Sequence, residues 1–154
     1  MPGEFNIVVT DTSCFIILEN IQLLDILTGL FGTVYTTPQI AREYGNPLPD
    51  WVVIKDATDR ALVEKFNQYV DLGEASAIAL ATEINATYMI IDDKEARKYA
   101  DKIGMNVRGT LGLLVAAKQH GLISALKPYL EKIADTNFRV STKLLQQLLK
   151  DAGE

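Results

Sequence analysis

Several carboxylate side chains stand where an α/β protein places its chemistry. Asp11 directly follows an apolar run over residues 6–10, and Asp92 and Asp93 directly follow a second apolar run over residues 88–91. If both runs are parallel strands, their carboxyl ends meet at one edge of a sheet, where open α/β folds bind ligands. Aspartates that gather without histidine or cysteine suit hard divalent cations such as Mg²⁺ and Mn²⁺. The sequence therefore predicts an acidic, metal-binding edge.

Two glutamates extend this acidic set. Glu43 lies on a short helix predicted over residues 38–43, and Glu74 lies in the first turn of a helix predicted after Gly73. Each of the five acids also has a structural interpretation when it is taken alone. The three aspartates fit helix N-caps, Glu74 fits a first-turn acid favoured by the helix dipole, and Glu43 fits a solvated surface residue.

Other common chemistries lack their residues in this chain. The one cysteine, Cys14, excludes an intramolecular disulfide and a cysteine-cluster metal site, and it is predicted to be a small buried hydrophobe. The one histidine, His120, is predicted at a helix end, where the dipole favours it. A single histidine leaves no Ser-His-Asp arrangement and no usual zinc site. Glycine-rich phosphate-binding motifs are missing, so nucleotide cofactors have no support.

Buried strands and amphipathic helices are expected to position the acids. Residues 6–10 and 88–91 are continuously apolar, which is typical of parallel strands covered on both faces. Weaker strands are predicted over residues 33–36, 51–54 and 105–108. Helical periodicity fills the intervals, over residues 57–70 and after Gly73, Asp93 and Thr110. Strands that alternate with helices predict an α/β domain with a mainly parallel sheet.

The length and the C-terminal pattern predict a single domain over residues 1–154. The chain has 154 residues, 48% of them hydrophobic, which is enough for a proper core. A helical segment over residues 122–150 is expected to pack on the domain. Within it, Pro128 predicts a turn followed by a helix, and Ser141 predicts the N-cap of a helix over residues 142–150.

The charge balance and the absence of targeting signals favour a soluble, cytoplasmic protein that does not enter a membrane. No apolar run approaches the 18 or so residues of a membrane span, and the N-terminus lacks a basic, then apolar, pattern. The net charge of −5 disfavours a generic nucleic-acid coat. It leaves room for an enzyme that acts on nucleic acid through a metal and a local basic face.

Four segments of the sequence resemble the PIN-domain family of metal-dependent nucleases, and the resemblance covers most of the chain. The segments are residues 7–13 with Asp11-Thr12-Ser13 after the opening strand, residues 37–43 with the second acid, residues 72–81 with the third, and residues 89–97 with the fourth. Residues 108–114 and the helical C-terminus are similar to a prokaryotic PIN-like subgroup. The most specific match is the segment over residues 72–81.

The resemblance implies a fold, a cofactor and an activity. The fold is a three-layer α/β/α sandwich with a central parallel sheet, and the activity is hydrolysis of RNA phosphodiesters with Mg²⁺ or Mn²⁺. The acids that would hold the metal are Asp11, Glu43, Glu74 and either Asp92 or Asp93. The chain lacks the Thr-x-Asp or Thr-x-Asn of the commoner toxins after the fourth strand, so both aspartates stay candidates, with Asp92 preferred. The expected partners are a small antitoxin-like protein and, in a homo-oligomer, further copies of this chain.

Hydroxyl and basic side chains are expected to bind the substrate. Thr12 and Ser13 would donate to a phosphate or to a metal-bound water. Arg97 and Lys98 belong to a basic set at positions 94, 97, 98 and 102, whose spacing places the four side chains on one helix face. Such a face can bind backbone phosphates. Its other interpretation is a solvated surface whose cations pair with Glu95 or Asp101.

Two other functions remain as alternatives. The first is a catalytically weak or inactive PIN fold that acts as an RNA- or protein-binding module. The second is a different carboxylate–Mg²⁺ domain, either a receiver-like phosphoacceptor or a haloacid-dehalogenase-type phosphatase. Asp11-Thr12-Ser13 lacks the Asp-x-Asp pair of those phosphatases, and a receiver carries its acid pair near the first strand, whereas this chain carries it after a later one.

Overall fold

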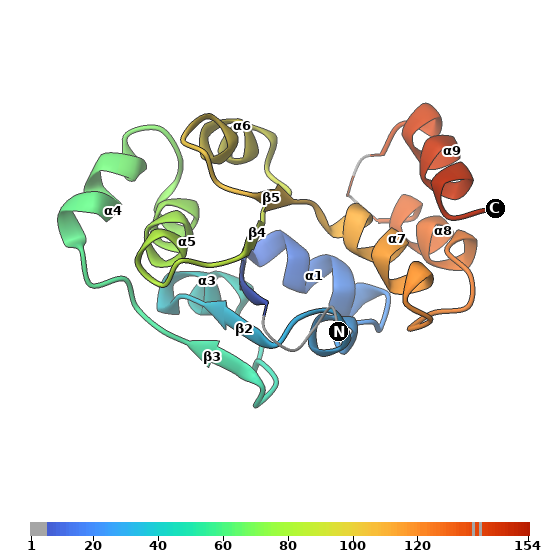
Figure 1. Ribbon diagram of the computed structural model, residues 1–154, viewed down its shortest axis with the longest axis horizontal. Helices are drawn as coiled ribbons and strands as arrows, with labels where there is room; N and C mark the ends of the chain where they lie inside the picture. Colours follow the sequence, from blue (N-terminus) through green and yellow to red (C-terminus); the bar gives the residue numbers. More distant parts are fainter. Residues whose placement is uncertain (1–5, 137, 139) are drawn as a thin grey trace.

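A parallel sheet forms the centre of the computed structural model, which describes residues 6–136, 138 and 140–154. In this part of the chain the sheet has five strands: β1 (Ile7–Thr10), β2 (Thr33–Thr36), β3 (Val52–Ile54), β4 (Tyr88–Ile90) and β5 (Val107–Arg108). Their order is β3-β2-β1-β4-β5, and every neighbouring pair is parallel (Figure 1). The predicted three-layer α/β/α class is confirmed.

Helices surround the sheet because each strand is followed by a helical crossover. They are α1 (Thr12–Asn20), α2 (Ile26–Leu30), α3 (Pro38–Tyr44), α4 (Arg60–Asn67), α5 (Leu72–Glu83), α6 (Lys94–Lys102), α7 (Thr110–Gln119), α8 (Lys127–Ala134) and α9 (Thr142–Asp151). From β1 the chain adds β2 and then β3 on one side of the sheet. It then returns past β1 and adds β4 and β5 on the other side. Right-handed crossovers therefore place α1 to α3 on one face and α4 to α6 on the other.

The two strongest predicted strands lie side by side at the centre of the sheet. β1 pairs with β4 in a register that puts Thr10 opposite Ile90. Both strands end at the same edge, and the backbone N–H of Asp11 continues the ladder by donating to the carbonyl oxygen of Ile90 at 3.0 Å. Val8 and Val9 are fully buried, as expected for a strand that is covered on both faces.

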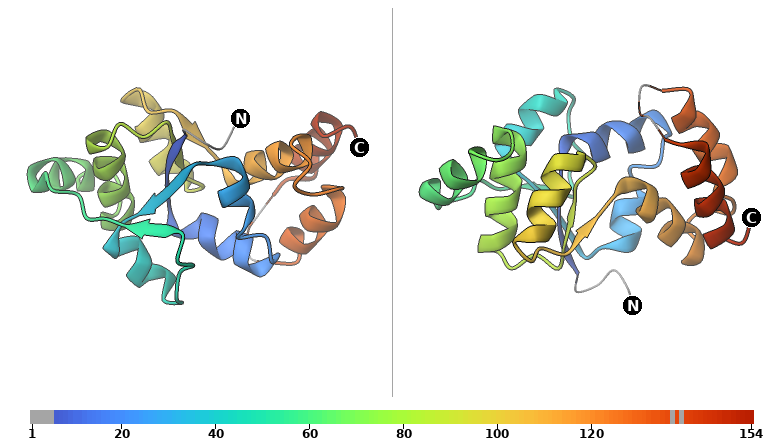
Figure 2. Two further views of the ribbon diagram at one scale, coloured as in Figure 1. Left: turned by 60° about the horizontal axis from the view of Figure 1, so that its bottom comes forward. Right: turned by 90° about the horizontal axis from the view of Figure 1, so that it is seen from above.

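The C-terminal helices gather at one end of the molecule, opposite α4 (Figures 1 and 2). α7 packs on α1 and α2, and α9 packs on α7. The carboxylate of Glu154 accepts hydrogen bonds from the Leu126 amide at 2.6 Å and from Lys118 Nζ at 2.9 Å. The last residue is thereby bound to the start of α8 and to α7.

Several predicted boundaries are correct. Ser141 caps α9 by accepting a hydrogen bond from the Leu144 amide, and Pro128 lies in the first turn of α8. Cys14 is fully buried, and His120 is the C-terminal cap of α7. Residues 1–5, 137 and 139, which the predicted domain includes, lie outside the described residues. None of the helices described is long and apolar enough to cross a membrane.

Other boundaries were predicted too long. The helix expected over residues 57–70 is α4, only Arg60–Asn67, because the side chain of Asp59 accepts the Leu62 amide and begins the helix there. The strands expected over residues 51–54, 88–91 and 105–108 shorten to the three residues of β3, the three of β4 and the two of β5. Between β4 and β5 the hydrogen bonds reach one residue beyond these bounds, since the Ile91 amide donates to the Arg108 carbonyl and the Met89 amide to the Asn106 carbonyl.

Candidate active site

Asp11 is fixed at the carboxyl end of β1 by backbone donors from two elements. Its Oδ1 accepts the Cys14 amide at 2.9 Å, which caps α1, and its Oδ2 accepts the Asp92 amide at 2.9 Å. The residue is fully buried. Burial, followed by the negative charge of Asp92, raises the pKa of Asp11 to about 7. A buried carboxyl that lacks a cation nearby holds its proton more tightly.

Glu74 enters the same region from the first turn of α5. Asp71 caps this helix by accepting the Glu74 amide at 2.9 Å. The Glu74 side chain is buried, and its Oε2 has no hydrogen-bond partner among the described residues. The pKa of Glu74 is raised to about 9, first by burial and then by the charges of Asp11, Asp71, Asp93 and Glu43. The charges of four carboxylates therefore act on a carboxyl group whose buried oxygen has no donor among the described residues.

Glu43 reaches Glu74 from the exposed side of α3. Its Oε2 accepts a hydrogen bond from Thr12 Oγ1 at 2.9 Å. Its carboxylate also lies against Gly73, where a Cβ atom would collide with Oε1. Glycine next to Glu74 thus leaves room for a second carboxylate, and any larger residue would displace it.

The neighbours Asp92 and Asp93 make different bonds. Asp92 accepts two hydrogen bonds from Thr110, one from its amide at 2.9 Å and one from its hydroxyl, and so joins the end of β4 to the start of α7. Burial raises the pKa of Asp92, while the Thr110 bonds and the Arg97 charge oppose the rise. Asp93 caps α6 by accepting the Ala96 amide at 2.9 Å. The charge of Asp93 acts on both Asp11 and Glu74.

A comparison with known protein families agrees with this arrangement. The family model that matches the chain is that of a PIN domain, and the match spans residues 7–154. The chain belongs to the PIN-domain family. PIN domains are generally nucleases and typically use divalent metals. No curated protein matches the chain.

The donor set of this PIN domain fits a hard divalent cation by its chemistry. All the gathered side chains offer carboxylate oxygens, which Mg²⁺ and Mn²⁺ prefer, and Glu74 Oε2 is a buried oxygen with no partner among the described residues. Within those residues, no three acidic, histidine or cysteine side chains stand in an arrangement that could itself hold a metal ion. The acids of this PIN domain therefore interact by charge without forming a closed coordination shell.

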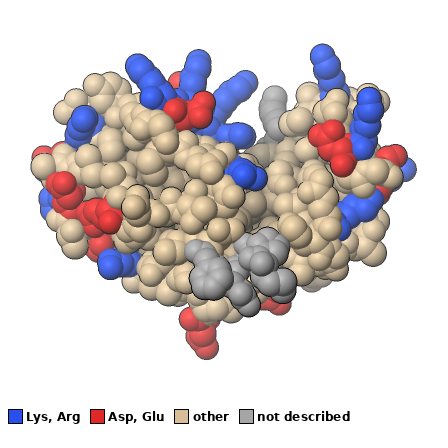
Figure 3. Space-filling model, in the orientation of Figure 1, with Lys and Arg blue, Asp and Glu red and all other residues tan. Residues whose placement is uncertain are grey.

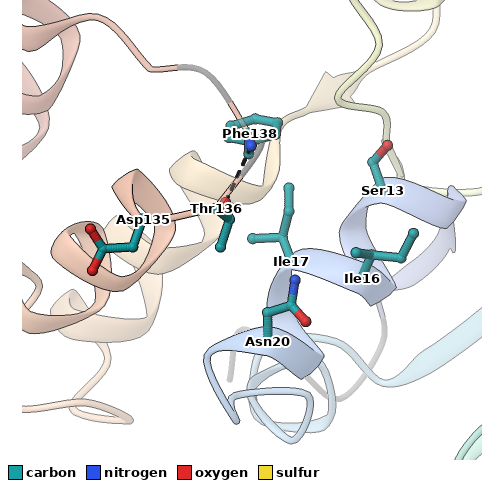
Figure 4. A pocket seen from close by; sticks show the side chains of 7 residues that line it. All are labelled: Ser13, Ile16, Ile17, Asn20, Asp135, Thr136 and Phe138. Carbon is teal, nitrogen blue, oxygen red and sulfur yellow. Dashed lines mark hydrogen bonds between the residues drawn. The ribbon is translucent and has the colours of Figure 1, made fainter.

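The structure separates the two hydroxyls that follow Asp11. Thr12 bonds Glu43, whereas Ser13 lines a pocket of about 480 Å³ between α1 and the segment after α8 (Figure 4). The other residues that line this pocket are Ile16, Ile17, Asn20, Asp135, Thr136 and Phe138. Thr12 therefore orients an acid of the site, and Ser13 belongs to a neighbouring hollow.

The predicted basic face is exposed along α6. Lys94, Arg97 and Lys98 line a second pocket of about 600 Å³, whose other lining residues are Asp92, Glu95, Asp101 and Val107. Lysine and arginine side chains project from the surface that Figure 1 places over α6 (Figure 3). Among the described residues, none of the basic side chains of α6 forms an ion pair with Glu95 or Asp101. Internal pairing therefore does not account for this face.

Sequence reasoning missed two residues that hold the site together. Thr110 is fully buried and donates twice to Asp92 from 18 positions further along the chain. Asp71 caps α5, and its charge acts on Glu74. The signal for Asp71 was present, since an N-cap residue followed three positions later by glutamate is typical of a helix start. Thr110 carried no local signal of its role.

Proposed function

We propose that this PIN domain is a metal-dependent endoribonuclease that hydrolyses phosphodiester bonds of RNA. The observation that carries the proposal is Glu74, a buried carboxylate without a hydrogen-bond donor among the described residues and with its pKa raised to about 9 by burial and by neighbouring acids. A buried carboxylate without a hydrogen-bond donor lowers the free energy of unfolding unless a cation offsets its charge. Membership of a family that generally consists of nucleases supports the same function.

The residues that would hold the ion are Asp11, Glu43, Glu74 and one or both of Asp92 and Asp93. A bound Mg²⁺ or Mn²⁺ lowers the pKa of its water and offsets charge on the scissile phosphate. The chain's own contribution is to orient these acids. Two backbone amides fix Asp11, Thr12 holds Glu43, and Thr110 holds Asp92.

Protons are expected to leave the site when the cation binds. With its pKa near 9, Glu74 keeps a proton at neutral pH in the metal-free protein, and Asp11 near 7 is partly protonated. Metal ligands must be deprotonated, so binding releases these protons. Metal affinity should consequently rise with pH over the neutral range.

The basic face of α6 is proposed to bind the phosphates of the substrate. Arg97 and Lys98 line a pocket that Asp92 also lines, so a strand held there would lie beside an acid of the proposed site. Replacing both by glutamine should weaken RNA binding and flatten its dependence on salt by roughly one unit of slope per lost contact. Binding titrations at several salt concentrations test this. If the slope of affinity against salt concentration is unchanged, Arg97 and Lys98 do not contact the RNA and belong to a solvated surface.

The partners and setting of the enzyme are proposed from the resemblance to toxin ribonucleases. They are a small antitoxin-like protein, a homo-oligomer of this chain and a cytoplasmic location. We also propose that residues 1–154 act as a single domain. The bonds of Glu154 to α7 and to the start of α8 support this, because they bind the last residue to the preceding helices.

A second function is a PIN fold of weak or no activity that binds RNA or protein. Both oxygens of Asp11 already accept backbone amides, and the described acids do not form a ready metal site. These two observations favour the second function over the enzyme.

Cleavage of single-stranded RNA separates the two functions. Protein stripped with EDTA and given Mn²⁺ again should cleave, and the stripped protein should not. Asp11→Asn should abolish cleavage, since a carboxylate ligand is lost. Asparagine keeps one of the two acceptors that Asp11 offers to backbone amides, so the circular dichroism spectrum, which should stay that of a folded protein, is recorded beside the rate. If Asp11→Asn cleaves as fast as the wild type, the proposed active site is wrong. If the remetallated wild type does not cleave but still binds RNA, the second function holds.

A further inference from the structure

Two tyrosine rings stack at the surface between α4 and α6. Tyr69 follows α4, and Tyr99 lies on α6; their ring centroids are 5.0 Å apart, and their planes are inclined by 13°. Beneath them, the buried ring of Phe66 meets Tyr99 edge to face, with centroids 5.8 Å apart. Tyr99 is thus fixed from below and supports Tyr69 from one side. We refer to Tyr69 and Tyr99 as the aromatic platform.

The outer ring of the platform has little cover from the fold. Tyr69 is 62% exposed, the largest exposed fraction among the large hydrophobic side chains that are open to solvent in the described residues. Leu72 and Ile103, near the platform in the sequence, are exposed as well. One face of the Tyr69 ring lies on Tyr99, and the large exposed fraction of the side chain leaves ring surface that a planar ligand can reach. Solvent-exposed aromatic rings in proteins that bind single-stranded nucleic acids stack on nucleobases.

The platform lies close in the chain to the starts of the two helices that carry site acids. α6 is capped by Asp93, and Tyr99 is six residues further along this helix, which is about 9 Å at the helical rise. Tyr69 lies in the turn after α4, two residues before Asp71, the cap of the helix that carries Glu74. A chain that passes from the acids along α6 would therefore meet the platform within the length of one or two nucleotides.

Positive charge accompanies the platform along α6. Lys102, one helical turn after Tyr99, and Lys98, next to Tyr99 in the sequence, are exposed, and neither forms an ion pair among the described residues. Glu95, one turn before Tyr99, is exposed as well. α6 also carries Glu95 and Asp101, so the helix is basic without being uniformly so. Aromatic rings beside unpaired cations favour a ligand that has flat rings and phosphates. A purely apolar protein surface would leave these lysines without partners.

We propose that the aromatic platform binds a nucleobase of single-stranded RNA next to the active site. The inference rests on the proposed function and names the substrate class, since a base inside a duplex has no free face to stack. Stacking of this kind tolerates any base, because every base has a π face. The platform thus selects unpaired RNA without reading its sequence, while the cations of α6 hold the backbone.

The test compares two strands that carry the same phosphates. One is a short oligouridine and the other is the same ribose-phosphate strand without bases; both are titrated by fluorescence anisotropy in EDTA, so that no cleavage occurs. The wild type should prefer oligouridine by roughly 5- to 100-fold, the range expected for one stacked base. Tyr69→Ala should lose most of this preference, and Tyr69→Phe should keep it because the ring remains.

Two further variants control for structure. Tyr69→Leu keeps an apolar side chain over Tyr99 without an aromatic face, and it should behave like Tyr69→Ala even if the alanine variant folds poorly. Tyr129→Ala removes a tyrosine of α8 whose ring lies 5.5 Å from Lys132 Nζ, away from the acids, and it should bind like the wild type. A duplex of the same length should bind all variants alike.

The outcomes separate this proposal from the nuclease proposal. If Tyr69→Ala and Tyr69→Leu both keep the preference for oligouridine, or if the wild type does not distinguish the two strands or binds neither, the platform is not a base site. Unchanged RNA binding in both variants would assign the exposed rings to a protein partner and likewise overturn the proposal. If the wild type prefers oligouridine but does not cleave RNA with Mn²⁺, the nuclease proposal fails and the platform stands.

Discussion

The two ends of α5 carry glutamates in opposite conditions. At its C-terminal end, Glu83 accepts the amides of Thr58 and Asp59 at 3.0 and 2.7 Å and the Thr58 hydroxyl at 3.1 Å. Its slight burial alone would raise its pKa, but these hydrogen bonds lower the pKa below the ordinary value. Glu83 is therefore kept as an anion that holds the loop before α4.

At the other end of the helix, Glu74 has no donor among the described residues and a pKa raised to about 9. Both side chains are glutamates of one helix, so residue type and helix propensity do not explain the difference. The chain provides donors to one carboxylate and surrounds the other with acids. The contrast indicates that Glu83 stabilises the fold, and it agrees with the proposal that Glu74 binds a cation.

The largest effect should be on cleavage. Glu74→Gln should reduce metal-dependent RNA cleavage by several orders of magnitude, because it removes a proposed ligand, whereas Glu83→Gln should cleave at close to the wild-type rate. Single-turnover cleavage of one RNA with Mn²⁺ measures both variants. If the two variants cleave at equal rates, Glu74 and Glu83 do not differ in their role in cleavage, and the comparison is wrong.

The second-largest effect should be on how the stability of the wild type and of Glu74→Gln depends on pH. The folded-state pKa of Glu74, about 9, lies above its ordinary value of 4.5, so the folded protein binds the extra proton and loses stability as pH rises between these values. In EDTA, Glu74→Gln should therefore gain stability relative to the wild type by up to about 1.4 kcal/mol per pH unit over this window. Urea unfolding at several pH values tests this. A constant difference would mean that Glu74 has an ordinary pKa.

Metal binding should stabilise the wild type by a smaller amount. An ion that binds only the folded state contributes roughly 2.7 kcal/mol at a hundred times its Kd, which raises the melting temperature of a domain of this size by several degrees. Thermal melts of EDTA-treated protein with and without Mn²⁺ should show this rise in the wild type and in Glu83→Gln. Asp11→Asn and Glu74→Gln should show much less of it. An equal rise in all four proteins would place the metal elsewhere.

The smallest effect should be the structural cost of Glu83→Gln. Loss of the charged acceptor weakens the bonds from Thr58 and Asp59, which should cost about 1 kcal/mol at neutral pH. The folded-state pKa of Glu83 is lowered, so its contribution is present above about 4.5 and is lost as pH falls through the folded value. Urea unfolding of Glu83→Gln at neutral and acidic pH measures both. No loss at neutral pH would show that these hydrogen bonds do not hold the loop.

Much of the fold was predictable because its signals are local. The apolar runs at β1 and β4 are long enough to identify as buried strands, and the acids that follow them fall at one edge because parallel strands end together. Caps such as Ser141 were equally visible, since the capping side chain and its amide partner are three residues apart. The predicted boundaries were too long at α4 and β5, and hydrogen-bonded residues such as Tyr69 and Val70 follow α4 as a turn.

The sequence by itself determined which acids stand at the strand and helix ends. Residue type, strand pattern and capping act over a few positions, so these features follow from neighbours in the chain. Only the tertiary structure decided which acids receive donors from distant parts of the chain. Thr110 bonds Asp92 across 18 positions, and Thr58 and Asp59 bond Glu83 across about 25. Tyr69, in the turn after α4, stacks on Tyr99 of α6. The state of a carboxylate depends on burial and on partners that packing brings from distant parts of the chain, so identical glutamates on one helix differ in their chemistry.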